Sequence, residues 1–196
     1  MSETERENWD RRYAEGDYQP RTEPAPFLEE WLNRLPTGRA LDVACGTGRN
    51  ALRLAEVGYA TEAVDISEVA IERARSEADR RGLTIEWRRA DLDEIELPEA
   101  RYDLITVIRY VNRDLWPRLV AALSANGAVL IEHHLQTEAV VDGPQSPEFR
   151  LRPQELLAAF RDLRIVYYSE TLEPADRPNA TFALARMVAY HGHRSW

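Results

Sequence analysis

Lysine is absent from the 196-residue sequence, so all 25 basic side chains are arginine, against 34 Asp and Glu and a formal net charge of −9. This lack of lysine is typical of a GC-rich genome, and we attach no mechanism to it. A chain of that net charge presents, on average, a repulsive field to polyanions. We therefore expect no nucleic acid and no membrane surface among its partners.

Cysteine and long apolar runs are also scarce. Cys45 is the only cysteine, which excludes an intramolecular disulfide, and we expect it to be a small packed residue rather than a reactive thiol. No apolar run reaches the roughly 18 residues of a membrane span. The first residues, MSETERENWD, are too polar for a signal peptide. A cytoplasmic location is the expectation.

The amino-acid composition is typical of a folded chain. A hydrophobic content of 44%, with five Trp and eight Tyr, excludes a disordered polypeptide. The length suits one domain. We expect a single domain over 1–196, with a helical cap over 1–37 and a Rossmann-like core over 38–196.

Short β-rich apolar runs alternate with helical patterns, which favours an α/β fold with parallel strands and helical crossovers. Seven strands are predicted, at 39–43, 60–65, 84–89, 102–109, 128–133, 164–169 and 181–190. Four helices are predicted between them, at 49–57, 68–81, 115–123 and 153–160. The last two strands are joined by ETLEPADRPNA, a segment rich in turn formers, so they should form an antiparallel hairpin. The prediction is a doubly wound, seven-stranded, mostly parallel sheet with a C-terminal antiparallel hairpin.

Several residues are typical of helix ends. Ser67 can cap the helix over 68–81, while Pro117 and Pro153 suit first turns. Three glycines stand where helices should stop: Gly58, Gly82 and Gly127.

Two further helices are predicted before the first strand. Trp9 and Tyr13 are four residues apart, on one face of a short helix. RTEPAPFLEEWLNRLP then gives an amphipathic helix, entered through Pro24 and Pro26 and left through Pro36. The simplest interpretation is that both helices cover the sheet.

The segment ACGTGRNA follows an apolar strand and opens a helix, the context that gives a glycine-rich loop its meaning. Gly46 and Gly48 allow a tight turn and a close approach to a ligand. Amides near Arg49 and Asn50 offer partial positive charge to a carboxylate or phosphate. Because Gly46-x-Gly48-x-x-Ala51 also fits the dinucleotide pattern, the loop alone leaves the cofactor open.

Carboxylates after the next two strands indicate an adenosine slot. Asp65 can accept hydrogen bonds from both hydroxyls of a ribose, or cap the helix near Ser67. Asp91 can accept a hydrogen bond from an adenine amino group, with Ile66 and Leu92 as apolar walls, or lie in a polar turn.

Asp42 lies inside the first predicted strand. A carboxylate there is a poor strand former and is costly to bury without a partner. Loop amides or the ammonium group of a cofactor can supply that partner.

Four motifs resemble, in order and spacing, those of class I S-adenosylmethionine-dependent methyltransferases: LDVACGTG, VDIS, RADL and YDLITVIRYVNR. The resemblance spans about 39–135. RYVNR and FRLRPQELLAAF are similar to bacterial small-molecule methyltransferases related to tellurite-resistance and thiol-directed enzymes. The resemblance implies S-adenosylmethionine as cofactor and S-adenosylhomocysteine as product. It also implies the C-terminal hairpin and an N-terminal segment that folds over the cofactor, which makes Tyr13 a candidate contact.

The resemblance also implies a role for individual positions. Gly46 and Gly48 would lie beside the methionine moiety, and Asp65 would bind the ribose. The adenine would lie at Asp91 and Leu92, and the transferable methyl group near Arg109. Ala44 stands where many relatives have glycine, a departure expected to cost little.

Methyl transfer is an in-line displacement at a sulfonium, so the enzyme mainly aligns the reactants and excludes water. A thiolate acceptor needs little further help, whereas an alcohol or amine benefits from a base. The candidate catalytic residues are Arg109, Tyr110 and His133. His133 and His134 should face opposite sides of their strand, and each is either functional or simply hydrogen-bonded.

Other residues of RYVNR could line an acceptor pocket. Tyr110 and Asn112 are candidates, while Arg109 and Arg113 either hold an anionic substrate or pair with the many acids. His191 and His193 lack a third ligand nearby, so no metal site is expected.

A nicotinamide-dependent oxidoreductase is the main alternative function, although a Tyr-x-x-x-Lys pair is excluded by the absence of lysine. A non-catalytic adenosine-binding module is another. We expect a small-molecule acceptor as partner and a monomer or homodimer.

Overall fold

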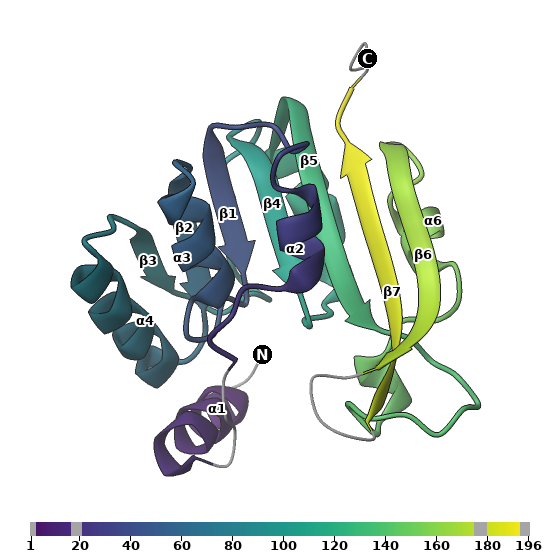
Figure 1. Cartoon of the computed structure of the whole chain (residues 1–196), viewed down its shortest axis with the longest axis horizontal. Helices are drawn as coiled ribbons and strands as arrows, with labels where there is room; N and C mark the ends of the chain where they lie inside the picture. Colours follow the sequence, from purple (N-terminus) through teal and green to yellow (C-terminus); the bar gives the residue numbers. More distant parts are fainter. Residues whose placement is uncertain (1–2, 17–20, 175–179, 193–196) are drawn as a thin grey trace.

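A computed structural model describes residues 3–16, 21–174 and 180–192. Seven strands form one sheet in the order β3-β2-β1-β4-β5-β7-β6. Their bounds are β1 Arg39–Val43, β2 Ala60–Asp65, β3 Glu86–Arg89, β4 Tyr102–Ile108, β5 Leu123–His134, β6 Arg164–Pro174 and β7 Thr181–Tyr190. Strands β1 to β5 are parallel, and β7 runs antiparallel to β5 and β6 (Figure 1). The predicted sheet with its C-terminal hairpin is confirmed.

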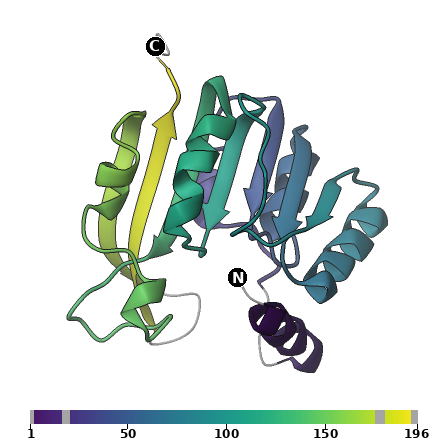
Figure 2. The ribbon, with the colours of Figure 1, turned by 180° about the vertical axis from the view of Figure 1, so that it is seen from behind.

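The helices cover both faces of this sheet. They are α1 Glu3–Glu15, α2 Pro26–Trp31, α3 Arg49–Glu56, α4 Glu68–Arg81, α5 Trp116–Ala122 and α6 Glu155–Ala159. Helices α2 and α3 lie in front of the sheet in Figure 1, and α5 and α6 lie in front in the reverse view of Figure 2. Among the described residues, no helix has both the length and the apolar character that crossing a membrane requires.

Most of the predicted helix ends are confirmed. Ser67 caps α4 by accepting a hydrogen bond from the Ala70 N–H, and Gly82 ends the helix in the left-handed conformation, with φ 68°. Pro117 lies in the first turn of α5. Pro153 lies outside α6, which begins at Glu155.

The prediction that Gly127 ends a helix is wrong, because strand β5 already begins at Leu123. A Cβ atom at Gly127 would lie 2.6 Å from the carbonyl oxygen of Tyr102. Glycine is needed here for the close approach of the β4 backbone, a contact between chain segments that local sequence does not reveal.

Three apolar clusters lie between the sheet and its helices, and the two larger ones lie on opposite faces. Successive residues of one strand enter different clusters, as the twofold period of a strand requires. Leu41 and Ile105 pack toward α5 and α6, whereas Ala40 and Leu104 pack toward α2. Because both faces are buried, the carboxyl ends of the parallel strands are left as the edge where a ligand can bind.

Helix α1 lies at this edge rather than on a face of the sheet (Figure 1). It packs against α4, while α2 buries Phe27, Leu28 and Trp31 against the sheet. The simple expectation that both N-terminal helices cover the sheet is therefore correct for α2 and wrong for α1.

Candidate functional site

The loop from β1 to α3 contains three residues with positive φ: Ala44 at 53°, Gly46 at 54° and Gly48 at 80°. A Cβ atom at Gly48 would lie 2.6 Å from the ring of Trp87, so this glycine permits packing of the loop against β3. A Cβ atom at Gly46 would lie 2.8 Å from the Tyr13 hydroxyl oxygen. The left-handed conformation of Ala44 costs on the order of 1 kcal/mol of folding free energy. This is more than the small cost expected for alanine in place of glycine at this position.

Asp42 has the amide partner that its position in β1 calls for. It is 1% exposed, and its Oδ2 accepts a hydrogen bond from the Ala51 N–H at 3.1 Å. Its Oδ1 accepts a second, from the Thr106 hydroxyl of β4 at 2.7 Å. Burial raises the pKa of Asp42 to about 7, against the opposing effect of Thr106. The carboxyl therefore joins β1, β4 and the first turn of α3 under the glycine loop.

Asp65, at the end of β2, holds the other side of this loop. Its Oδ2 accepts a hydrogen bond from the Gly46 N–H at 2.7 Å, and its Oδ1 accepts one from the Ser67 N–H at 3.0 Å. Burial raises the pKa of Asp65, while these hydrogen bonds oppose the rise. Each carboxylate oxygen has a second lone pair, so the backbone contacts leave acceptor capacity for ribose hydroxyls.

Helix α1 is joined to the same residues. Asp10 Oδ1 accepts hydrogen bonds from the Ser67 hydroxyl at 2.6 Å and from the Val69 N–H at 3.3 Å. Tyr13 is buried, with its hydroxyl beside Gly46. A continuous set of polar contacts therefore runs from α1 to Asp65 and the glycine loop.

Asn50 anchors the chain that leads into α2. Its side-chain carbonyl accepts a hydrogen bond from the Ala25 N–H at 2.9 Å, and neighbouring Arg49 donates one to the Glu23 carbonyl at 3.1 Å. The side-chain oxygen of Asn50 is thus used within the protein. Its part in cofactor binding stays a prediction about the first turn of α3.

The residues predicted to surround adenine lie beyond β2 and β3. Asp91 Oδ1 accepts a hydrogen bond from the Asp93 N–H at 2.9 Å, which forms the polar turn that was the alternative to adenine binding. Ile66 is 7% exposed. Leu92 is 1% exposed and belongs to the main apolar cluster. An adenine contact at these three predicted positions stays a prediction.

Tyr110 lies within electrostatic reach of this region. Burial raises the pKa of Tyr110 to about 12, and the charges of Asp91, Glu5 and Asp65 contribute to the rise. Asn112 donates a hydrogen bond to its hydroxyl at 3.4 Å. The phenol is therefore neutral near pH 7, and Tyr110 packs against the main apolar cluster.

Arg109 follows β4 in the left-handed conformation, with φ 64°. Its Nε lies 3.1 Å from Glu132 Oε1, an ion pair without hydrogen-bond geometry. Its Nη1 lies 3.2 and 3.3 Å from the two ring nitrogens of His134. Its guanidinium carbon is 4.8 Å from the centre of the Phe182 ring. Arg109 therefore combines a left-handed backbone conformation with a side chain that contacts residues of β5 and β7.

The two histidines at the end of β5 have different surroundings. His133 Nε2 lies 2.8 Å from the Phe149 carbonyl oxygen, whereas His134 is beside Arg109. Burial lowers the pKa of His133 to about 4 and that of His134 to about 2. Both rings are neutral near pH 7. The histidine that meets Arg109 is His134, and the catalytic role of His133 stays a prediction.

Arg113 pairs with a glutamate and with backbone carbonyls, which is the alternative to binding an anionic substrate. Its Nε and Nη2 donate to Glu155 at 2.6 and 3.1 Å, and two further hydrogen bonds reach the carbonyls of Glu148 and Arg150. This arginine holds the segment between β5 and α6 in place.

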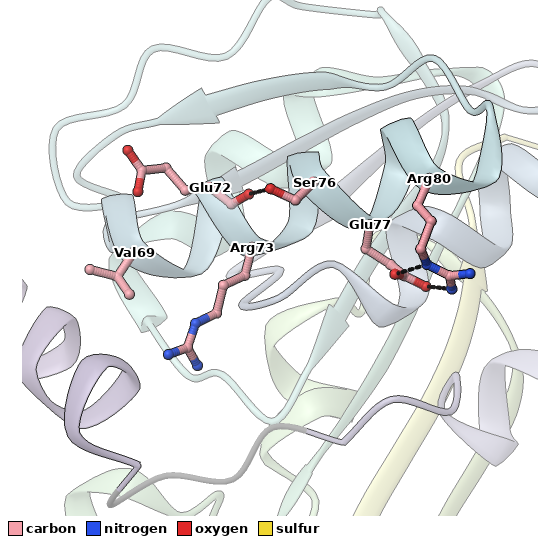
Figure 3. Close-up of a pocket in the computed structure, with 6 residues that line it drawn as sticks. All are labelled: Val69, Glu72, Arg73, Ser76, Glu77 and Arg80. Carbon is pink, nitrogen blue, oxygen red and sulfur yellow. Dashed lines mark hydrogen bonds and ion pairs between the residues drawn. The ribbon is translucent and has the colours of Figure 1, made fainter.

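One hollow on the surface lies away from these residues. Figure 3 shows that its lining comes entirely from the exposed stripe of α4. The lining residues are Val69, Glu72, Arg73, Ser76, Glu77 and Arg80. Glu77 is engaged by Arg80 at 2.5 Å. The hollow belongs to a solvated helix face and not to the candidate site.

The described part of the chain contains no group of three or more His, Cys, Asp or Glu side chains arranged to hold a metal. His191 Nδ1 lies 3.1 Å from the Ser124 carbonyl oxygen. His193 lies outside the described residues.

Comparison with known proteins identifies the family. Residues 40–130 match the family described as Methyltransferase domain. These residues, just under half of the chain, carry a methyltransferase domain. S-adenosylmethionine is the cofactor that this family and fold imply.

Relatives agree with this assignment. Ribosomal protein L11 methyltransferase of Symbiobacterium thermophilum is 32% identical over 57% of this chain and 40% of its own. The probable S-adenosyl-L-methionine-dependent methyltransferase TehB of Haemophilus influenzae is 26% identical over 68% of this chain and 49% of its own. The chain spans about half the length of the curated relatives it matches.

Solved structures share the fold. TehB from Haemophilus influenzae has a TM-score of 0.75 at 20% identity, covering 93% of this chain and 66% of its own. A structure concerning the conversion of a disulfide bond into a thioacetal group during echinomycin biosynthesis has a TM-score of 0.73 at 23% identity, covering 97% of this chain and 94% of its own.

Four residues at the candidate site are not predicted from the sequence: Asp10, Arg21, Glu132 and Phe182. Glu132 had a usable signal, since a carboxylate within an apolar strand needs a buried partner, as Asp42 does. The other three had none, because their roles depend on segments that meet only in the fold.

Proposed function

We propose that this chain transfers the methyl group of S-adenosylmethionine to a small-molecule acceptor, a thiol or a chalcogen oxyanion. The observation that carries the choice of acceptor is the protonation of the side chains around Arg109. An acceptor that ionises readily reaches the site as a nucleophile, whereas an alcohol or amine needs a group that takes its proton.

The histidines at the end of β5 and the tyrosine that follows Arg109 are poor bases at neutral pH. The pKa of His133 is lowered to about 4 and that of His134 to about 2. The pKa of Tyr110 is raised to about 12, so its hydroxyl keeps its proton. Asp42 has a pKa of about 7, but it is 1% exposed and engaged on both oxygens.

The residues at the carboxyl edge fit the cofactor. Asp65 offers a fixed, buried carboxylate with lone pairs to spare, and the absence of a Cβ atom at Gly46 lets the Tyr13 hydroxyl of α1 approach the glycine loop. Bound there, S-adenosylmethionine supplies an activated methyl group on a sulfonium. The chain's own work is to hold the ribose at Asp65, position the acceptor near Arg109 and exclude water with α1.

Calorimetry with S-adenosylmethionine, S-adenosylhomocysteine and NAD tests the cofactor. We expect the first two to bind and NAD not to. A methyl-transfer screen over thiols, selenium and tellurium oxyanions, amines and carboxylic acids then tests the acceptor. Turnover restricted to amines would overturn the acceptor class, and binding without turnover on any acceptor would favour the non-catalytic module.

Asp65→Ala should weaken S-adenosylmethionine binding by roughly 1 to 3 kcal/mol, the range for a hydrogen bond to a charged group. Titration calorimetry measures the change, and circular dichroism checks that the variant is folded. Asp79→Ala, on the exposed side of α4, removes one carboxylate elsewhere and serves as control. A folded Asp65→Ala protein with the wild-type dissociation constant contradicts the ribose role.

A further inference from the structure

Arginines gather near the end of β4, although the formal net charge of the chain is −9. Burial lowers the pKa of Arg109; Glu132 opposes this, and Arg21, Arg49 and Arg186 lower it further. Three arginines therefore lie close enough to act on a fourth. A local positive region in an acidic protein attracts an anion.

The same positive field reaches the end of β5. After burial, the charge of Arg109 is the largest cause of the lowered pKa of His134, and Arg150 and Arg21 add to it. For His133 the charged groups that lower the pKa are again arginines, Arg109 among them. Two neutral histidines therefore border the positive region.

Arg21 and Arg109 converge on a single aromatic ring. Their guanidinium carbons lie 5.5 and 4.8 Å from the centre of the Phe182 ring, which is 6% exposed. The ring face attracts both cations and orients their planes. Each guanidinium presents N–H donors in a planar fork that matches a carboxylate or oxyanion.

Arg21 is brought here by a tethered segment of the chain. Four residues later, the Ala25 N–H donates to Asn50, and the Glu23 carbonyl accepts from Arg49. These two bonds hold the segment at the start of α3, and Arg21 continues from it to Phe182 on β7.

The position of this cluster in the sheet separates it from the adenosine side. Asp65 ends β2 and Asp91 follows β3. On the other side, Arg109 follows β4, His134 ends β5 and Phe182 lies near the start of the antiparallel strand β7. In the strand order β3-β2-β1-β4-β5-β7-β6, the glycine loop after β1 lies between the two groups. A ligand at the second group is therefore placed beside the cofactor rather than on its adenosine half.

We propose that Arg21 and Arg109, set against Phe182, bind an anionic group of the methyl acceptor, so that Arg21 selects acceptors by their charge. This inference rests on the proposed function and narrows the class of acceptor. The acceptor carries a carboxylate or an equivalent oxyanion, either as part of its nucleophile or in addition to it. The methionine carboxylate of the cofactor shares this chemistry, and the test separates the two sources.

The test compares two thiols of similar size, mercaptoacetate and 2-mercaptoethanol, on wild type and Arg21→Gln. Loss of one charged contact should raise the dissociation constant and KM of mercaptoacetate about tenfold and leave those of 2-mercaptoethanol unchanged. Binding is measured by NMR titration in the presence of S-adenosylhomocysteine, independently of turnover. Arg21→Lys keeps the charge and should recover part of the mercaptoacetate binding.

Arg34→Gln is the matched control. Arg34 also stacks on an aromatic ring, 5.4 Å from the centre of Trp31, but its carbonyl meets Tyr190 at the opposite end of β7. This variant should bind both thiols as the wild type does.

The possible results test the anion site separately from the proposed methyl transfer. Equal binding of the two thiols by wild type, or equal weakening of both in Arg21→Gln, overturns it. Weaker S-adenosylmethionine binding with an unchanged preference for mercaptoacetate assigns Arg21 to the cofactor and also overturns it. Arg21-dependent binding of mercaptoacetate without methylation supports the anion site while counting against a thiol acceptor.

Discussion

At the level of single residues, Asp42 links the stability of the fold to pH. Its pKa is 3.8 in an unfolded chain and about 7 when buried. Between these values the folded protein holds a proton that the unfolded chain has released. The free energy of unfolding should therefore fall as pH rises from about 4 to 7 through this one group.

Asp42→Asn removes this titration and keeps both partners, since its carbonyl can accept from Ala51 and its amide can donate to Thr106. Relative to wild type, the variant should gain on the order of 2 kcal/mol between pH 5 and pH 8. Urea unfolding at several pH values measures this difference. Asp79→Asn controls for the loss of one charge, and a wild-type minus Asp42→Asn difference that is constant with pH refutes the prediction.

At the level of elements, α1 depends on its docking. An isolated helix of 13 residues is marginal in water, and α1 has mostly polar side chains. Asp10 joins it to the beginning of α4 through Ser67 and Val69, where a carboxylate also meets the positive end of the helix dipole.

Asp10→Ala should weaken the docking of α1 by roughly 1 to 2 kcal/mol, the sum of two lost hydrogen bonds. Amide hydrogen exchange in α1 should then become about tenfold faster or more, with the sheet unaffected. Glu7→Ala, on the exposed side of the same helix, is the control. Unchanged exchange in the Asp10 variant would show that other contacts dock α1.

At the level of the whole molecule, the cofactor should stabilise the fold, because its proposed contacts join α1, β1 and β2. At about 100 times the dissociation constant, ligand binding adds about 2.7 kcal/mol. For a chain of this length, that raises Tm by roughly 5 to 10 °C. Scanning calorimetry with S-adenosylhomocysteine measures the shift, and NAD at the same concentration should leave Tm unchanged. The reverse pattern contradicts the assignment of the cofactor.

The sequence by itself determined the features whose causes are local. Helix α4 begins and ends as predicted, because the capping by Ser67 and the left-handed turn at Gly82 act within a few residues. The alternation of strands and helices determined the α/β class in the same way. Asp42 was recognised as needing a buried partner because a lone carboxylate inside a strand is costly wherever it lies.

Only the tertiary structure decided which distant residues meet. Asp10 and Ser67 are 57 positions apart, and Asp42 and Thr106 are 64 apart. Arg21 reaches Phe182, Gly127 makes room for the β4 backbone, and Arg113 is occupied by Glu155. No local pattern encodes these contacts, since each depends on how whole elements pack. That packing decides which side chains surround the glycine loop.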